Sequence, residues 1–190
     1  MNLTGEISSA RPLLVLATTE EAAHLAEDFP VLLTGMGKVN AAAALAAVLG
    51  RGDLPSAVVN LGTAGALSAV GPDVYEVGTV VQHDLDTAAL RALTGESYGL
   101  PLKLTDEGPT LATGDSFIAD SSARERLAAR ADLVDMEGYA LAHVSLRAQV
   151  PVRLVKHVSD SADEGAGDAW RRNVDNSARA LADWVRANLR

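Results

Sequence analysis

Short runs of apolar residues alternate along the chain with alanine-rich stretches that mix apolar and charged positions. The apolar runs are bounded by proline, glycine or polar residues and predict strands: RPLLVLA, PVLLTG, SAVVNLG, GTVVQHD and PVRLVKHV. The stretches between them predict helices: EEAAHLAED, KVNAAAALAAVLG, DMEGYALAHV and a long C-terminal helix from about Asp168 to Leu189. Strands separated by helices indicate an α/β fold in which helices cover both faces of a largely parallel sheet.

The length and composition predict one compact domain. A chain of 190 residues with 48% hydrophobic content can build one substantial core but not two. We therefore expect a single domain over residues 1–190, with residues 1–10 flexible. The polar opening MNLTGEISSARP lacks the apolar segment of a signal peptide, and no apolar run approaches the ~20 residues that span a bilayer. With no cysteine in the chain, these features predict a cytoplasmic protein.

The charge narrows the range of partners. The formal net charge is −9, so neither nucleic acid nor an anionic membrane surface would be attracted to the protein. A small neutral or cationic molecule fits this charge better.

Polar residues and glycines follow the predicted strands, at the sheet edge where ligands collect in α/β proteins. They are Glu20 and Glu21, residues 35–38, residues 62–65, residues 83–86, and Ser159 to Asp163. Asp160 is the most informative of them, because a carboxylate at the end of a core strand is costly unless a partner or a ligand uses it. The sequence therefore predicts a binding site at these strand ends.

Taken singly, these motifs leave their functions open. GMGKVN lacks the spacing of a phosphate-binding loop and the third glycine of a dinucleotide fingerprint, so it reads as a tight turn. NLGTAG presents small residues and backbone N–H groups that suit an oxygen-rich ligand, or simply a close-packed turn. His83, Asp84 and Asp86 have no second cluster at a ligand-like spacing, so no metal site is predicted. Glu137 fits either a helix N-terminus or a carboxylate that accepts hydrogen bonds from a diol.

In order, these motifs resemble the nucleoside phosphorylase and nucleosidase superfamily, and most closely its 5′-methylthioadenosine/S-adenosylhomocysteine nucleosidases. The similarity runs through nearly the whole chain, in LLVLATTEEAAHL, GMGKVNAAAAL, VVNLGTAGAL, VGTVVQHDLD, LATGDSFIAD, DMEGYALAHV and VKHVSDSAD. It implies a three-layer α/β/α fold around a mixed, largely parallel twisted sheet, in a trimmed version because little chain separates the first predicted helix from PVLLTGMG.

The resemblance also assigns roles to individual residues. It implies that Glu21 activates water and that Asp160 is the catalytic acid, which donates a proton to the purine. The implied substrate-binding residues are Thr63, Ala64, Gly65, Phe117, Ile118, Met136, Glu137, Ser159 and Trp170, with Glu137 holding the ribose hydroxyls, Ser159 supporting the acid and Trp170 covering the base. No cofactor is implied. Relatives close the pocket with a neighbouring subunit, so a homodimer is expected, with the segment from His83 to Pro101 as its contact.

Three other functions remain open at this point. A phosphorylase would use phosphate in place of water, but Asn60 stands where phosphorylases of this type have an arginine. A non-catalytic nucleoside-binding protein would have no need of Glu21, Glu137 and Asp160 together. A hydrolase of a modified nucleoside, such as futalosine hydrolase, is the third alternative. Lys156, where relatives commonly have arginine, and the divergent stretch EGAGDAWRRNVDNS leave the 5′ substituent of the substrate undetermined.

Overall fold

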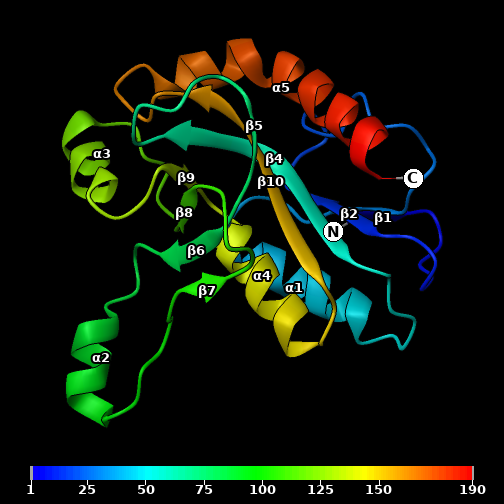
Figure 1. The fold of residues 1–190 in the computed structure, drawn as a ribbon, viewed down its shortest axis with the longest axis horizontal. Helices are drawn as coiled ribbons and strands as arrows, with labels where there is room; N and C mark the ends of the chain where they lie inside the picture. The colour runs from blue at the N-terminus through cyan, green and yellow to red at the C-terminus, as the bar shows by residue number, and fades with distance from the viewer. Residues whose placement is uncertain (1, 190) are drawn as a thin grey trace.

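The computed structural model describes residues 2–189, in which ten strands form a mixed sheet between helices (Figure 1). The strands are β1 (Asn2–Thr4), β2 (Leu13–Leu16), β3 (Val31–Leu33), β4 (Val58–Ala66), β5 (Val74–Glu76), β6 (Thr79–Gln82), β7 (Leu102–Lys103), β8 (Thr110–Thr113), β9 (Leu133–Asp135) and β10 (Val152–Asp160). The helices are α1 (Lys38–Leu49), α2 (Thr87–Thr94), α3 (Ser121–Ala128), α4 (Gly138–Arg147) and α5 (Ala166–Asn188). None of the helices within residues 2–189 is both long and apolar enough to cross a membrane.

The predicted three-layer architecture is confirmed. Alternation along β2 assigns each side chain to one face of the sheet, because successive residues of a strand point in opposite directions. Leu13 and Val15 pack with α1 and α4, whereas Leu14 and Leu16 pack with Leu181 and Val185 of α5. Figure 1 shows α5 along one face of the sheet and α1 with α4 along the other.

One predicted helix is absent and several short elements were missed. The segment EEAAHLAED forms turns, because it is shorter than the roughly 12 residues that make even a marginal helix and its side chains are engaged elsewhere. Glu21 accepts a hydrogen bond from the backbone of Thr63, and His24 contacts Asp175. β1, β5, β7, β9, α2 and α3 were not expected, since their sequences are too short or too polar to show a periodic pattern.

The site is positioned by two long parallel strands in the middle of the sheet. β4 and β10 pair from Val58↔Val152 to Ala64↔Val158, and a bulge before Asp160 shifts the register so that Asp160 lies opposite Gly65. Both strands therefore end at the same edge of the sheet. β9 pairs with the end of β4 and leads directly into Glu137 and α4.

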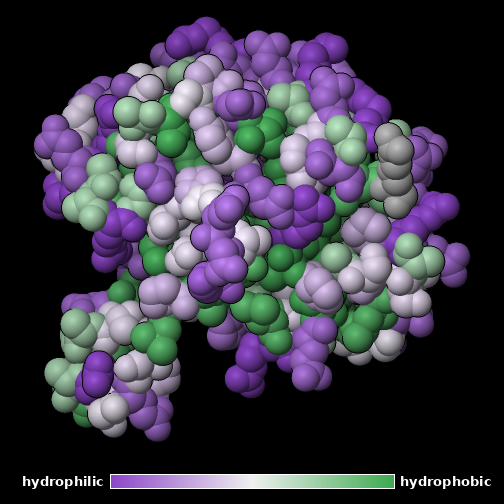
Figure 2. Space-filling view, viewed as in Figure 1, coloured by the Kyte–Doolittle hydropathy of each residue, from purple (hydrophilic) through white to green (hydrophobic). Residues whose placement is uncertain are grey.

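Residues 83–101, which we call the arm, differ from the rest of the molecule. The arm contains α2 and extends away from the sheet, where it forms a separate lobe of mixed apolar and polar surface (Figures 1 and 2). None of the residues of α2 is buried, and Leu93 is 81% exposed. The hydroxyl of Tyr139 in α4 donates to the carbonyl of Leu100, where the arm returns to the body.

Candidate active site

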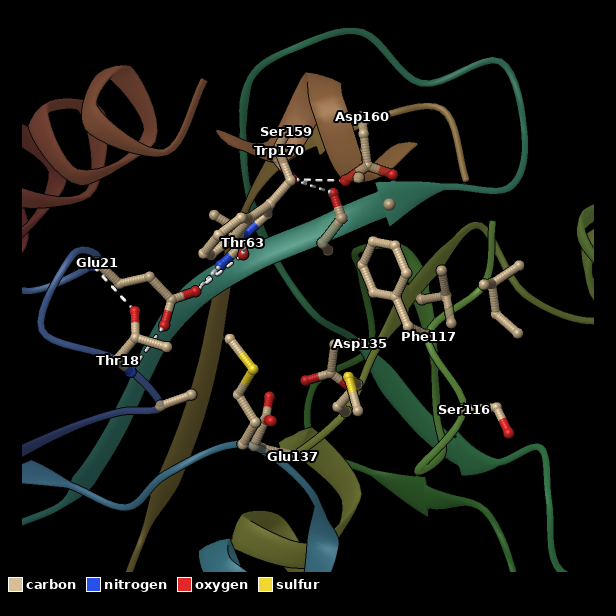
Figure 3. A pocket seen from close by; sticks show the side chains of 18 of the residues that line it. Thr18, Glu21, Thr63, Ser116, Phe117, Asp135, Glu137, Ser159, Asp160 and Trp170 are labelled. Atoms are coloured by element: carbon tan, nitrogen blue, oxygen red, sulfur yellow. Dashed lines mark hydrogen bonds between the residues drawn. The ribbon is translucent and has the colours of Figure 1, made fainter. Parts of the chain in front are cut away.

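A pocket of about 230 Å³ opens where β4, β9 and β10 end. Every residue that the resemblance assigned to the site lines it: Glu21, Thr63, Ala64, Gly65, Phe117, Ile118, Met136, Glu137, Ser159, Asp160 and Trp170. They come from six separate parts of the sequence, so the fold brings together what the sequence could only present as fragments. Figure 3 shows the pocket with Glu21, Asp160 and Glu137 at its edges.

Glu21 lies on the turn after β2 and points toward the middle of β4. Its Oε1 atom accepts hydrogen bonds from the backbone nitrogen and from the hydroxyl of Thr63, each at 2.8 Å. Its Oε2 atom accepts a longer bond of 3.3 Å from the backbone nitrogen of Thr18. Although only 4% exposed, the side chain is thus well supplied with donors, as a buried carboxylate requires.

Asp160 ends β10 on the opposite side of the pocket. The hydroxyl of Ser159 donates to its Oδ2 atom at 2.8 Å, and the backbone nitrogen of Ala162 donates to Oδ1 at 2.9 Å. A Cβ atom at Gly65 would lie 3.0 Å from Oδ1, so a glycine at this position leaves room for the carboxyl group. These contacts fix the orientation of Asp160 toward the pocket.

Glu137 occupies the third corner, immediately before α4. Its Oε1 atom accepts a hydrogen bond of 2.8 Å from the backbone nitrogen of Gly37, which precedes α1. Burial, and then the negative charge of Asp135, raise the pKa of Glu137 to about 7. Glu137 can therefore change its protonation state near neutral pH.

A buried ion pair between Lys156 and Asp135 lies beneath Glu137. The Lys156 Nζ atom is 2.8 Å from Asp135 Oδ2, and the two side chains are 2% and 1% exposed. Asp135 also accepts from the backbone of Gly138 at 2.8 Å and from the hydroxyl of Thr113 at 2.6 Å. Burial acts to lower the pKa of Lys156, but the charges of Asp135, Glu137 and Glu21 outweigh it, so the pKa is raised and the ammonium stays charged.

Neither member of this pair was predicted as part of the site. The sequence held one signal for Lys156, a lysine in the middle of the apolar strand PVRLVKHV. Charged residues are almost never fully buried unless they are paired, so such a lysine indicates an acidic partner. The partner itself could not be identified, because Asp135 lies 21 positions earlier in the chain, on a short strand that the pattern did not reveal.

Apolar side chains form the remaining walls. Phe117 lies on the Asp160 side of the pocket and Trp170 on the Glu21 side (Figure 3). Four further apolar residues line the pocket: Met36, Ile118, Val134 and Met136. Phe117 and Met36 are 51% and 50% exposed at the pocket mouth. The pocket therefore combines flat or flexible apolar surfaces with a few fixed carboxylates, which suits a ligand with an aromatic ring and several hydroxyl groups.

The residues set aside in the sequence analysis lie elsewhere. His83, Asp84 and Asp86 are in the arm outside this pocket, and Asp84 pairs with Lys38. In the part of the chain that the structure describes, no group of three or more His, Cys, Asp or Glu side chains has the arrangement of a metal site. Asn60 is buried within β4 and donates to the carbonyl of Val15, and it does not line the pocket.

The pocket is poor in positive charge. Its lining includes four carboxylates, Glu21, Asp135, Glu137 and Asp160, and one basic residue, Arg171. The Arg171 side chain is 73% exposed and pairs with Asp168 on the same helix. Lys156 is bound to Asp135 beneath the surface. A phosphate dianion would find no free buried cation among these residues, whereas a neutral water molecule is compatible with them.

A family model described as the phosphorylase superfamily matches residues 82–189. A 5′-methylthioadenosine/S-adenosylhomocysteine nucleosidase of Geobacillus sp. (strain WCH70) is 30% identical over 184 residues, covering 83% of this chain and 78% of the relative. The enzyme of the same name from Bacillus subtilis (strain 168) is 32% identical over 191 residues, covering 83% and 82%.

Solved structures show the same fold. A Helicobacter pylori 5′-methylthioadenosine/S-adenosylhomocysteine nucleosidase in complex with a pyrrolidine-containing ligand has a TM-score of 0.81 at 21% identity, covering 95% of this chain and 98% of that one. The futalosine hydrolase of Helicobacter pylori has a TM-score of 0.78 at 20% identity, covering 93% and 96%. At these identities the likeness concerns the fold alone.

Proposed function

Since the chain belongs to the phosphorylase superfamily and groups there with the 5′-methylthioadenosine/S-adenosylhomocysteine nucleosidases, we propose that it hydrolyses the N-glycosidic bond of a purine nucleoside of that type. The products are the free base and the free sugar. The convergence of Glu21, Glu137 and Asp160 in one pocket carries this proposal. A binding protein would need a carboxylate for the ribose, but it would have no use for an acid and a second carboxylate on either side of the scissile bond.

Asp160 acts in this proposal as the general acid. Cleavage of the bond between the purine and the anomeric carbon leaves an electron pair on the base, which is a poor leaving group as an anion. Transfer of a proton from Asp160 to N7 of the purine neutralises it, and general acids of this kind contribute roughly 10²–10⁴ to the rate. Ser159 and the backbone of Ala162 hold the carboxyl group in position for that transfer.

Glu21 acts on the water. As the bond to the base breaks, positive charge develops on the sugar and a water oxygen bonds to the anomeric carbon, while a proton of that water passes to Glu21. Oε1 is occupied by the two donors of Thr63, which leaves Oε2, with its longer bond to Thr18, as the oxygen that accepts from water. A water held at this place attacks with little loss of entropy in the transition state.

Glu137 binds the 2′ and 3′ hydroxyls of the ribose. A carboxylate accepts two such bonds, and Gly37 fixes the orientation of this one by donating to Oε1. Met136 packs against the sugar, Phe117 and Ile118 contact the base, and Thr63, Ala64 and Gly65 form the floor of the site. The ionised form of Glu137 accepts both hydroxyls, and its pKa of about 7 makes this step sensitive to pH near neutrality.

Futalosine hydrolysis is the second candidate, because the structure of a futalosine hydrolase is nearly as similar to this chain as that of a nucleosidase. The end of the pocket that would hold the 5′ substituent bears on the choice between the two substrates. In this chain Met36 is half exposed at the mouth of the pocket, and its apolar side chain suits a short apolar group, which favours the methylthio substituent.

We also propose that the enzyme is a cytoplasmic homodimer in which the arm meets the partner. Leu93, Tyr98 and Leu100 are 81%, 43% and 54% exposed, so one subunit by itself leaves these apolar side chains in water. Exposed apolar clusters of this kind are typical of interfaces. A cyclic dimer is the commonest closed assembly of identical chains. The small-molecule nucleoside is the only other partner that the proposal requires.

The reaction is tested with a panel of purine nucleosides incubated with and without phosphate, followed by identification of the base and the sugar. We expect free adenine and free sugar from methylthioadenosine, at a rate that does not depend on phosphate. The matched control is Asp160→Asn, purified in parallel, which should fold normally and turn over roughly 10²–10⁴ more slowly. A sugar 1-phosphate would assign a phosphorylase instead, and a fully active Asp160→Asn protein would remove Asp160 from the mechanism.

A further inference from the structure

A chain of hydrogen bonds connects Trp170 of α5 to the carboxylate of Glu21 (Figure 3). The indole Nε1 donates to the hydroxyl of Thr63 at 3.0 Å, and that hydroxyl donates to Glu21 Oε1 at 2.8 Å. We propose that Trp170 is a positioning residue for Glu21: it orients the Thr63 hydroxyl so that the water-activating carboxylate is held in its reactive orientation. This proposal rests on the role of Glu21 in the proposed function.

The donor and acceptor of each hydrogen bond between Trp170, Thr63 and Glu21 follow from the chemistry of the three side chains. An indole N–H can only donate, and a hydroxyl carries one hydrogen and two acceptor positions. When the Thr63 oxygen accepts from Trp170, its own hydrogen is left for another acceptor, which is Glu21 Oε1. Without the indole N–H the Thr63 hydroxyl loses the donor that fixes its rotation, so its bond to Glu21 is less constrained.

The two oxygens of Glu21 are thereby made unequal. Oε1 accepts from the backbone nitrogen and the hydroxyl of Thr63 at 2.8 Å each, whereas Oε2 accepts only the 3.3 Å bond from Thr18. Bonds from neutral donors to a carboxylate are charge-assisted and orient it strongly. Oε1 is therefore the anchored oxygen, and Oε2 remains available to the water that attacks the sugar.

The position of Trp170 is itself fixed by the packing of α5. Three residues further along the helix, the side-chain amide of Asn173 donates at 2.7 Å to the carbonyl of Ser159, beside Asp160. One turn later, Ser177 is buried and its hydroxyl contacts His157 Nδ1 at 2.9 Å. The first turns of α5 thus contact both catalytic sides of the pocket, through Trp170 at Thr63 and through Asn173 at Ser159.

Trp170 could act only as an apolar surface of the pocket, or it could act through its indole N–H. The two roles predict different activities for variants that remove the N–H. Trp170→Phe keeps an aromatic ring and removes the N–H donor. If Trp170 acts only as an apolar surface, this variant should keep its activity. Thr63→Val removes the hydroxyl that accepts the hydrogen bond from Trp170, whereas Thr63→Ser keeps a hydroxyl at this position. The other tryptophan, Trp184, stacks on Arg153 outside the pocket, so Trp184→Phe is the matched control.

The test measures kcat and KM for methylthioadenosine in these variants, in Trp170→Phe/Thr63→Val and in Glu21→Gln, with folding checked by circular dichroism. We expect Trp170→Phe to lower kcat by roughly five- to tenfold, as for one lost hydrogen bond, with KM nearly unchanged. Thr63→Val should lower kcat at least as much, Thr63→Ser should retain most of it, and the double variant should be no slower than Thr63→Val.

The results separate the two proposals. A Trp170→Phe protein with the kcat of the wild type, a change in KM alone, or a double variant whose losses multiply would each overturn the role of Trp170 while Glu21→Gln remains inactive. An active Glu21→Gln protein would instead refute the assignment of Glu21, and with it the proposed mechanism. Trp184→Phe should match the wild type, and a comparable loss there would mean that the effect of Trp170→Phe is general rather than local.

Discussion

The pocket and the arm differ in which side chains they bury and which they expose. In the pocket, Lys156, Asp135 and Glu21 are buried and the polar groups have named partners: Lys156 with Asp135, Glu21 with Thr63, and the half-buried Asp160 with Ser159. In the arm, apolar groups are exposed, and α2 has no buried residue. A buried charge is expensive unless it is paired, and an exposed apolar patch is costly unless something covers it. The charged and polar groups of the pocket are therefore satisfied within one chain, whereas the apolar side chains of α2 are not covered by it.

The largest effect should come from breaking the buried pair of the pocket. Lys156→Met keeps the length of the side chain but leaves Asp135, Glu137 and Glu21 without a buried cation. Removal of one partner of a buried ion pair typically costs about 3–5 kcal/mol, so we expect a loss of that size in the free energy of unfolding, measured by urea denaturation at neutral pH.

Two variants sharpen this prediction. Lys103→Met is the matched control, because the ion pair of Lys103 with Asp106 is on the surface and its side chain is 68% exposed, so a change below about 1 kcal/mol is expected. In Lys156→Met/Asp135→Asn both charges are gone, and part of the lost stability should return. Equal losses in the free energy of unfolding for Lys103→Met and Lys156→Met would show that the buried ion pair contributes no more to stability than the exposed one.

The same contrast explains what the sequence could predict. The main strands were readable, because Leu13 to Leu16 and Val152 to Val158 lie in short apolar runs that proline or polar residues bound. The positions of Glu21 and Asp160 after predicted strands indicated a site, but the roles of these residues and of Glu137 came from the resemblance, and only the three-dimensional fold brings the three together. Asp135 was not predicted as a site residue, because its partner Lys156 is distant in sequence. The hydrogen bonds that link Trp170 to Glu21 through Thr63 could not be predicted from the sequence either, since a hydrogen bond depends on geometry at the scale of one atom.

The wrong helix at EEAAHLAED has a related cause. Its composition favours a helix, but local preference is a weak prior that tertiary contacts override. Glu21 contacts β4, His24 contacts α5 and Leu25 packs against the sheet, so the segment follows the surface on which it lies. In the arm, by contrast, Asp86 accepts a hydrogen bond from the backbone of Ala89 and caps α2, which forms with little tertiary support.

An intermediate effect is expected from the buried carboxyl group of Glu137 and its dependence on pH. The folded pKa of about 7 lies above the ordinary value of 4.5, so the folded protein holds this proton more tightly than the unfolded chain does. The stability from neutral Glu137 is fully present below pH 4.5 and is lost as the pH rises through 7. Glu137→Gln cannot ionise and escapes this loss. Relative to the wild type, the variant should gain about 2–3 kcal/mol in the free energy of unfolding between pH 5 and pH 8.

Urea unfolding at intervals between these two pH values measures that difference. Glu125→Gln is the control, since Glu125 is an exposed residue of α3 and its substitution should shift the curve equally at every pH. A pH-independent difference between Glu137→Gln and the wild type would mean that Glu137 is ionised throughout. Binding gives a second readout: in the Asp160→Asn background, affinity for the nucleoside should rise as the pH passes through about 7, because only ionised Glu137 accepts both ribose hydroxyls.

The smallest effect should come from the arm, where the loss concerns association rather than folding. Leu90 and Leu93 lie three residues apart on one side of α2, and Leu93 is 81% exposed. If they meet the partner subunit, Leu90→Glu and Leu93→Glu should each weaken the dimer by about 1–2 kcal/mol, roughly tenfold in the dissociation constant, and leave the melting of the monomer unchanged. Arg91→Gln, on the same helix, is the control and should dissociate no more readily than the wild type.

Sedimentation velocity across a range of micromolar concentrations measures the fraction of dimer. KM for methylthioadenosine, determined in parallel, shows whether the arm also closes the pocket. A wild-type protein that is monomeric and fully active would show that the arm is an independent surface feature and that a single chain forms a working pocket.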